Sequence, residues 1–226
     1  MKQLFGNNAY DMLIADKGLI VVLEESDENG RYFCYKFISP TFTGEPMPIT
    51  KSSFLSAKFR DCYDALSMQI GNHIKTKIVW PSSKAAFAIT GDDGKAKILQ
   101  RNGCLVWQGS VVYKGEGPAD IALLDDTLWA SFPSSNALIR FNLRTMREEL
   151  RIGGPSDKAF SSPHGVFTDK QDNKLYVCSA GSGNITAVDL SSFTVCDYLH
   201  FDEPVRKYCR IGTNEYIMLD SGLYVK

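Results

Sequence analysis

Five residues with ionisable side chains recur at long intervals along the chain and are the first candidates for chemistry: Asp11, Lys75, Asp120, His164 and Arg206. Two carboxylates and an imidazole, from Asp11, Asp120 and His164, are groups that a divalent metal ion accepts as ligands. Such an ion activates water or polarises a carbonyl group. The charges of Lys75 and Arg206 oppose a divalent cation, however. The favoured interpretation is therefore that these cations pair with the carboxylates and that His164 hydrogen-bonds to neighbouring backbone.

The intervals between these residues follow a repeat in the sequence. Pro118, Pro163 and Pro204 are separated by 45 and 41 positions, and each opens a copy of one pattern. In that pattern, short apolar runs alternate with turns rich in Asp, Asn, Gly and Ser, which is typical of β-strands joined by tight turns. Four such strands form an antiparallel meander with the length of one propeller blade.

The repeat predicts an all-β fold. A chain of 226 residues divided into copies of about 45 residues indicates a single β-propeller domain over residues 1–226, with five blades of four-stranded antiparallel meanders. The last copy ends after its third strand, at residues 223–226, whereas the chain begins with an unmatched apolar run, Gln3-Leu4-Phe5. We expect this N-terminal segment to supply the missing outer strand and close the ring, because closure removes exposed sheet edges.

One segment has helical rather than strand periodicity. Between residues 51 and 73, apolar side chains follow one another at steps of three or four positions, namely Leu55, Phe59, Cys62, Leu66 and Ile70. This spacing predicts an amphipathic helix over about residues 53–70, inserted into the propeller. Packing of its apolar face on the propeller is favoured over binding of a partner. If the segment forms strands instead, the ring has six blades.

The best-defined copy, PHGVFTDKQDNKLYVCSAGSGNITAVD at residues 163–189, resembles the NHL-type and YVTN-type β-propeller repeats. The shared features are a Pro-x-Gly-hydrophobic first strand, a polar turn and a Leu-Tyr-Val strand. In propellers, ligands bind at the mouth of the central channel, where the innermost strands begin. The repeat alignment places the following residues there: Tyr10, Asp11, Lys75 to Lys77, Ala119, Asp120, His164, Gly165, Val205 and Arg206.

Composition narrows the range of partners. The 25 basic and 26 acidic residues give a formal charge of -1, and no run of five like charges occurs, so nucleic-acid binding has no signal in the sequence. The chain has no run of eighteen apolar residues and no apolar signal segment at its start, so we expect a cytoplasmic protein without a membrane span. Six scattered cysteines without C-x-x-C spacing indicate free thiols rather than a zinc or disulfide framework.

Specific catalytic motifs are missing from the sequence. It contains no G-x-G-x-x-G, P-loop, H-E-x-x-H or G-x-S-x-G motif, so no cofactor is required by the sequence and none is identified by it. Cys178 with His164 is an alternative nucleophilic pair, although a buried strand thiol is the favoured interpretation. His73 and His200 have no partner that the sequence identifies.

Two functions remain. The first is a non-catalytic propeller scaffold that binds a protein or peptide through its loops or channel mouth, where the mixed ring of charges suits a zwitterionic or peptide-like ligand. The second is a metal-dependent, lactonase-like hydrolase or lyase of small molecules, with Asp11, Asp120 and His164 at the central channel. The absence of catalytic motifs favours the first.

Overall fold

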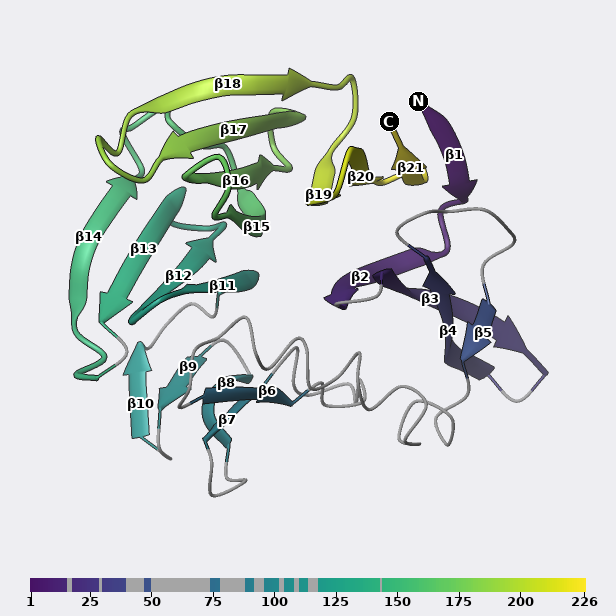
Figure 1. Ribbon diagram of the computed structural model, residues 1–226, viewed down its shortest axis with the longest axis horizontal. Coiled ribbons are helices and arrows are strands. Elements are labelled where there is room, and N and C mark those ends of the chain that lie inside the picture. The colour runs from purple at the N-terminus through teal and green to yellow at the C-terminus, as the bar shows by residue number, and fades with distance from the viewer. Residues whose placement is uncertain are drawn as a thin grey trace.

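The computed structural model (Figure 1) describes residues 1–15, 18–28, 30–39, 47–49, 74–77, 88–91, 96–101, 104–107, 110–113, 118–142 and 144–226. Every regular element in these residues is a β-strand, and the strands form sheets arranged around a common centre, as in a β-propeller. The prediction of an all-β propeller is confirmed. Among the described residues, no helix is long and apolar enough to cross a membrane.

The strands form antiparallel sheets that follow the chain order. Sheet I contains β2 (Ala9–Ala15), β3 (Gly18–Asp27), β4 (Gly30–Ile38) and β5 (Met47–Ile49). Sheet II contains β6 (Ile74–Lys77), β7 (Ala88–Gly91), β8 (Ala96–Arg101), β9 (Cys104–Trp107) and β10 (Ser110–Tyr113). Sheet III contains β11 (Asp120–Leu124), β12 (Thr127–Phe132), β13 (Ala137–Asn142) and β14 (Glu148–Gly153).

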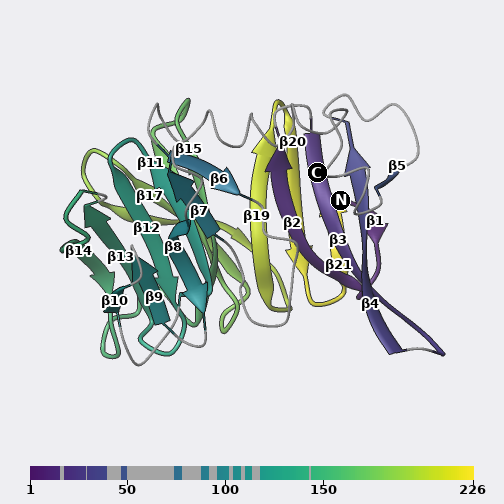
Figure 2. The same cartoon turned by 90° about the horizontal axis from the view of Figure 1, so that it is seen from below.

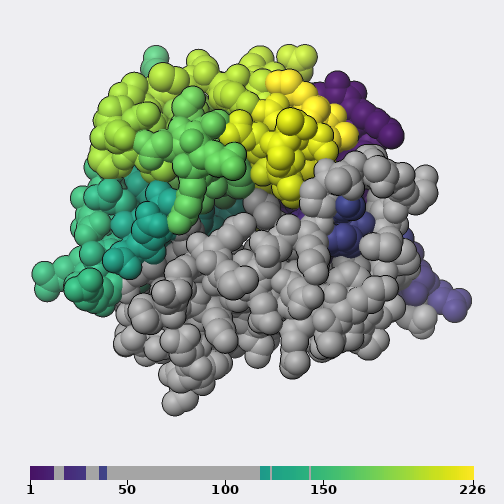
Figure 3. Space-filling model, viewed as in Figure 1, coloured from purple at the N-terminus to yellow at the C-terminus, as the bar shows by residue number. Residues whose placement is uncertain are grey.

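The last two sheets are formed by the C-terminal part of the chain and by the N-terminal strand. Sheet IV contains β15 (Pro163–Asp169), β16 (Lys174–Ser179), β17 (Asn184–Asp189) and β18 (Val195–His200). Sheet V contains β19 (Val205–Ile211), β20 (Asn214–Leu219), β21 (Gly222–Val225) and β1 (Lys2–Phe5). The first strand of each meander lies innermost, and Figure 2 shows β2 and β19 side by side. In Figure 3, sheets III to V form a continuous packed arc.

The two ends of the chain meet in sheet V. Strand β1 pairs antiparallel with β21, so the sheet order is β1-β21-β20-β19 and the N-terminal segment supplies the outer strand, as predicted. The approach of β1 is close at Gly222, where φ is 144° and an added Cβ would lie 2.1 Å from the carbonyl oxygen of Phe5. A glycine is therefore needed at this position, because a side chain there would push β1 away.

The predicted number and kind of blades were wrong, and no helix was found where the structure describes the chain. Four sheets are four-stranded blades, but sheet II has five strands, so the expected five blades of four strands each are not what the chain forms. The described residues contain no helix at all. The segment 53–70, to which the helix and the alternative sixth blade were assigned, lies outside the described residues.

The core lies between neighbouring sheets, which explains the uninterrupted apolar runs in the sequence. The middle strands β12, β16 and β20 each have five of six residues buried, because neighbouring parts of the propeller cover both faces of these strands. One cluster joins sheets I and V: Met12, Leu19, Val21, Leu23, Ile38, Cys209, Tyr216, Met218 and Leu223. A second joins sheets III and IV: Trp129, Leu138, Phe160, Val166, Leu175, Val177 and Val188.

Candidate functional site

The five ionisable candidates for the channel mouth lie near the starts of innermost strands. Asp11 is in β2, Asp120 opens β11, His164 is the second residue of β15 and Arg206 is the second residue of β19. Lys75 lies in β6 opposite Thr90 of β7, but its side chain is outside the described part of the structure.

Lys207, which is not among the residues predicted from the sequence, links the two predicted carboxylates. Its Nζ lies 2.7 Å from Oδ1 of Asp11 and 3.6 Å from Oδ1 of Asp120. We call Asp11, Asp120 and Lys207 the central ion cluster. Its members come from β2, β11 and β19, which belong to sheets I, III and V. Both carboxylates therefore pair with Lys207. Of the two cations expected as their partners, Arg206 pairs with Asp220 instead, and the side chain of Lys75 lies outside the described residues.

Asp120 is the most deeply placed member of the cluster, with a side chain 13% exposed. Its Oδ2 accepts a hydrogen bond from the Val166 amide at 3.1 Å, and its Oδ1 accepts one from the Ile121 amide at 3.0 Å. Burial raises the pKa of Asp120 and the nearby charge of Asp11 adds to this, while Lys207 and the two amides lower it; the net direction is upward.

The Lys207 ammonium is stabilised by the same contacts. Burial by itself lowers the pKa of Lys207, because it disfavours the charged amine. The carboxylates of Asp11 and Asp120 outweigh burial and raise the pKa above its ordinary value. Lys207 is therefore a cation at neutral pH rather than a neutral amine available as a base or nucleophile.

His164 and Arg206 form a second group beside the cluster. Arg206 Nε and Nη2 donate to the two carboxylate oxygens of Asp220, at 2.7 and 3.3 Å, and Nη1 lies 3.2 Å from Nε2 of His164. Nδ1 of His164 lies 3.0 Å from the Ser162 carbonyl oxygen, which can only accept. These partners assign a neutral imidazole with its proton on Nδ1 and with Nε2 accepting from the guanidinium.

The expected metal ligands are thus divided between two groups. Asp11 and Asp120 contact Lys207, whereas His164 contacts Arg206 and the backbone. In the described part of the chain, no group of three His, Cys, Asp or Glu side chains has an arrangement that could hold a metal ion. We name the combined set, Asp11, Asp120, His164, Arg206, Lys207 and Asp220, the mouth site.

Cys178 lies in the middle strand β16 and does not have the properties of a nucleophile. It is buried and unpaired by any disulfide. Burial, and less strongly the charge of Asp120, raises the pKa of its thiol well above the ordinary value, so the reactive thiolate is scarce at neutral pH.

We expect native protein at pH 8 to react with iodoacetamide at Cys196, on the exposed outer strand β18, at least roughly 10-fold faster than at Cys178 or Cys209, since the latter two are buried. Mass spectrometry of the resulting peptides measures each site separately. Denatured protein, in which the thiols are equally accessible, is the control. Rapid native labelling at Cys178 would contradict this assignment and restore it as a candidate nucleophile.

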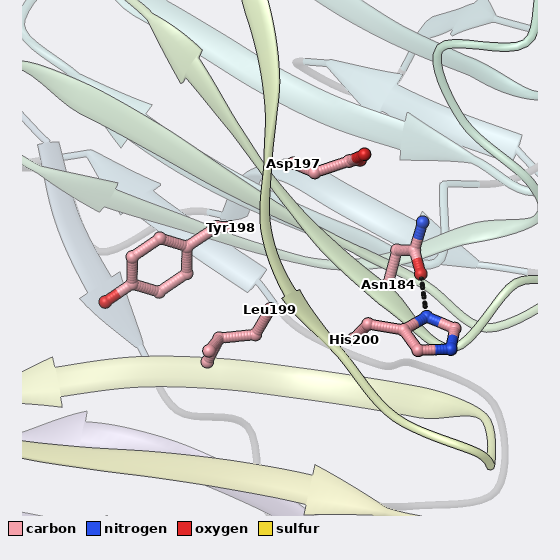
Figure 4. A pocket seen from close by; sticks show the side chains of 5 residues that line it. All are labelled: Asn184, Asp197, Tyr198, Leu199 and His200. Atoms are coloured by element: carbon pink, nitrogen blue, oxygen red, sulfur yellow. Dashed lines mark hydrogen bonds between the residues drawn. The ribbon is translucent and has the colours of Figure 1, made fainter.

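A shallow pocket of about 230 Å³ lies away from the mouth site, on the outer strand β18 (Figure 4). Its lining residues are Asn184, Asp197, Tyr198, Leu199 and His200. Nδ1 of His200 lies 2.5 Å from Oδ1 of Asn184, which identifies the partner that the sequence did not. The pocket has no residue in common with the predicted site.

Comparison with known proteins supports the fold and no finer assignment. No protein-family model matches the chain, and no curated protein sequence matches it. The structure is similar to the WD40 β-propeller domain of Doa1, with a TM-score of 0.50 and 7% identity over 96% of this chain and 88% of that chain. At this identity the likeness shows a β-propeller fold alone, and the NHL or YVTN type is not confirmed.

Two computationally designed proteins are also similar in structure. The Ika8 protein matches with a TM-score of 0.46 and 10% identity over 96% of this chain, which spans 57% of the Ika8 chain. The Ika4 protein matches with a TM-score of 0.43 and 12% identity over 69% of this chain and 92% of that chain.

Proposed function

We propose that the protein is a non-catalytic β-propeller scaffold that binds a protein or peptide partner at its mouth site. The observation that carries this proposal is that the groups with catalytic potential are already engaged inside the protein. Lys207 holds both carboxylates, and Arg206 holds His164 and Asp220. A general base or nucleophile needs a lone pair directed at substrate, whereas these groups form a fixed pattern of charge.

The same region offers the features of a binding surface. Tyr10, beside Asp11, is 57% exposed, and the Arg206 side chain is 42% exposed while its pairing with Asp220 keeps it oriented. Tyrosine and arginine are the residues most often found as energetic anchors of protein interfaces, because they combine apolar area with hydrogen-bond donors. A rigid anchor also loses little conformational entropy when a partner binds.

The alternative is a metal-dependent hydrolase or lyase with Asp11, Asp120 and His164 as ligands. The Lys207 ammonium lies against both carboxylates and disfavours a divalent cation at that position. The scaffold is therefore the better supported of the two functions.

We expect peptides selected from a displayed random library against the purified protein to bind at least about 10-fold more weakly to Tyr10→Ala and to Arg206→Ala, because each change removes an anchor. Titration calorimetry measures the change in Kd. Arg144→Ala, which removes an exposed arginine in the turn before β14, is the matched control and should bind as the unmodified protein does. Equal Kd values for all variants would place the binding surface elsewhere.

A metal titration separates the two functions. After treatment with EDTA, the scaffold should melt at the same temperature in calcium, magnesium, manganese or zinc. An ion that binds only the folded protein, at a hundred times its Kd, adds roughly 2.7 kcal/mol of stability. A stabilisation of that size that is lost in Asp120→Asn would overturn the scaffold proposal in favour of the enzyme.

A further inference from the structure

The side chain of Lys207 contacts two sheets besides its own. It starts in sheet V, and its Nζ contacts Asp11 of sheet I and Asp120 of sheet III. Asp120 in turn accepts a hydrogen bond from the Val166 amide of sheet IV. Four sheets, I, III, IV and V, are therefore connected through one ammonium group and two carboxylates.

Gly165 makes this reach possible. Sheet IV lies between sheets III and V, so the Lys207 side chain has to pass the innermost strand β15 to approach Asp120. An added Cβ at Gly165 would lie 2.5 Å from the Arg206 carbonyl oxygen, 2.8 Å from Lys207 Cα and 3.1 Å from Lys207 Cγ. The missing side chain leaves room both for close packing of β19 against β15 and for the stem of Lys207.

We propose that Lys207 acts as a tethered cation that sets the relative positions of sheets I, III, IV and V at the centre of the propeller. This conformational role goes beyond the proposed binding function and does not depend on it. The apolar clusters among the described residues join neighbouring sheets. Lys207 and its partners, in contrast, connect sheets that are not neighbours.

The charges explain why a cation is needed at this point. Asp11 and Asp120 approach the same position from two sheets, and without an intervening positive charge their carboxylates would repel each other. Removing one partner from a poorly solvated ion pair leaves the other charge uncompensated, which is strongly destabilising. A small ammonium ion from solution should replace the lost group if the position is a true cation site.

The test uses three variants of the full chain and their melting temperatures. Lys207→Ala removes both charge and stem, and Lys207→Met keeps an apolar stem of similar length without the charge. Lys170→Ala is the matched control, because Lys170 also contacts a carboxylate, Asp125 at 2.8 Å, but both side chains are more than half exposed. We expect both Lys207 variants to melt at least roughly 4 °C lower than the unmodified protein, and Lys170→Ala to melt within about 1 °C of it.

Chemical rescue separates a tethered cation from ordinary packing. About 100 mM n-propylammonium should restore at least half of the temperature lost by Lys207→Ala, as expected for a ligand that binds the folded state with a Kd near 10 mM. Tetramethylammonium at the same concentration should not do so, because it cannot donate hydrogen bonds. Lys207→Met that melts like the unmodified protein, or rescue that is equal for both ions, would overturn the proposal. The melting temperatures measure stability, whereas the peptide Kd values of Tyr10→Ala and Arg206→Ala measure partner binding, so the two proposals can fail separately.

Discussion

Replacing Gly165 by alanine should destabilise the protein by roughly 2 kcal/mol, and replacing it by valine by about 3 kcal/mol or more. Both atoms that a new Cβ would meet at less than 3 Å, the Arg206 carbonyl oxygen and Lys207 Cα, belong to the backbone of β19. Backbone atoms of a paired strand cannot rotate away as the end of a side chain does. The strand β19 would therefore have to move away from β15, and sheet V away from sheet IV.

Urea unfolding measures the free energy of each Gly165 variant, and the midpoint should fall without a large change in slope. Gly6→Ala is the matched control, since the nearest atom to its added Cβ is Oδ1 of Asn8 at 4.0 Å. That control should be neutral or slightly stabilising, because alanine reduces the entropy of the unfolded chain. If Gly165→Ala is as stable as Gly6→Ala, the close packing of β15 against β19 is wrong.

Trp129→Ala should have the largest effect of any single core truncation, about 3–5 kcal/mol. Trp129 is 1% exposed and is the largest of the fully buried side chains described by the structure. It lies in the middle strand β12 and fills the space between sheets III and IV. The ring of Phe193 lies beside it at a centroid distance of 6.3 Å, and the Arg140 guanidinium lies over it at 5.8 Å.

Trp129→Phe distinguishes loss of volume from loss of the indole N–H. Within the described residues, the buried Nε1 of Trp129 has no hydrogen-bond partner, so phenylalanine removes no bond and leaves a smaller cavity than alanine. We expect Trp129→Phe to cost less than half as much as Trp129→Ala, measured by the same urea unfolding. Equal losses would contradict the assignment of the effect to filled volume.

Local sequence determined the strands of the last three sheets and the way the chain ends are joined. The turns after Asp169 and before Asn184 lie where polar residues cluster in the sequence. In the first of these turns, Asp169 Oδ1 accepts hydrogen bonds from the amides of Gln171 and Asp172. The orphan apolar run at the N-terminus pairs with β21 as expected. Turn chemistry and apolar runs act over a few residues, so they can be recognised without the tertiary structure.

Only the tertiary structure decided how strands are shared among the sheets. Sheet II has five strands because β6 to β10 pair in succession, and the pairing of a short strand depends on its neighbours more than on its own residues. Dividing the chain length by the repeat length gives a number of blades, but it does not reveal an extra strand within one sheet. The expected five equal blades failed for this reason.

The mouth site, too, was predicted from the sequence in part and decided by the tertiary structure in part. The repeat placed Asp11, Asp120, His164 and Arg206 at the starts of innermost strands, as the structure does. It did not select Lys207, which is the residue that joins the carboxylates. Alternation along a strand predicts which residues share a face only where the strand is regular. The innermost strands β2, β15 and β19 each have a register shift near their start, between Ala9 and Asp11, between Pro163 and Val166, and between Val205 and Lys207.

A bulge redirects the side chains that follow it, and its position is set by pairing with the next strand. The sequence by itself therefore determined which strand ends meet at the centre of the propeller. Which side chains touch there, and that the Lys207 ammonium contacts both aspartates, was decided by strand register and by the missing side chain at Gly165. Both are products of packing between segments far apart in the chain, which no local pattern records.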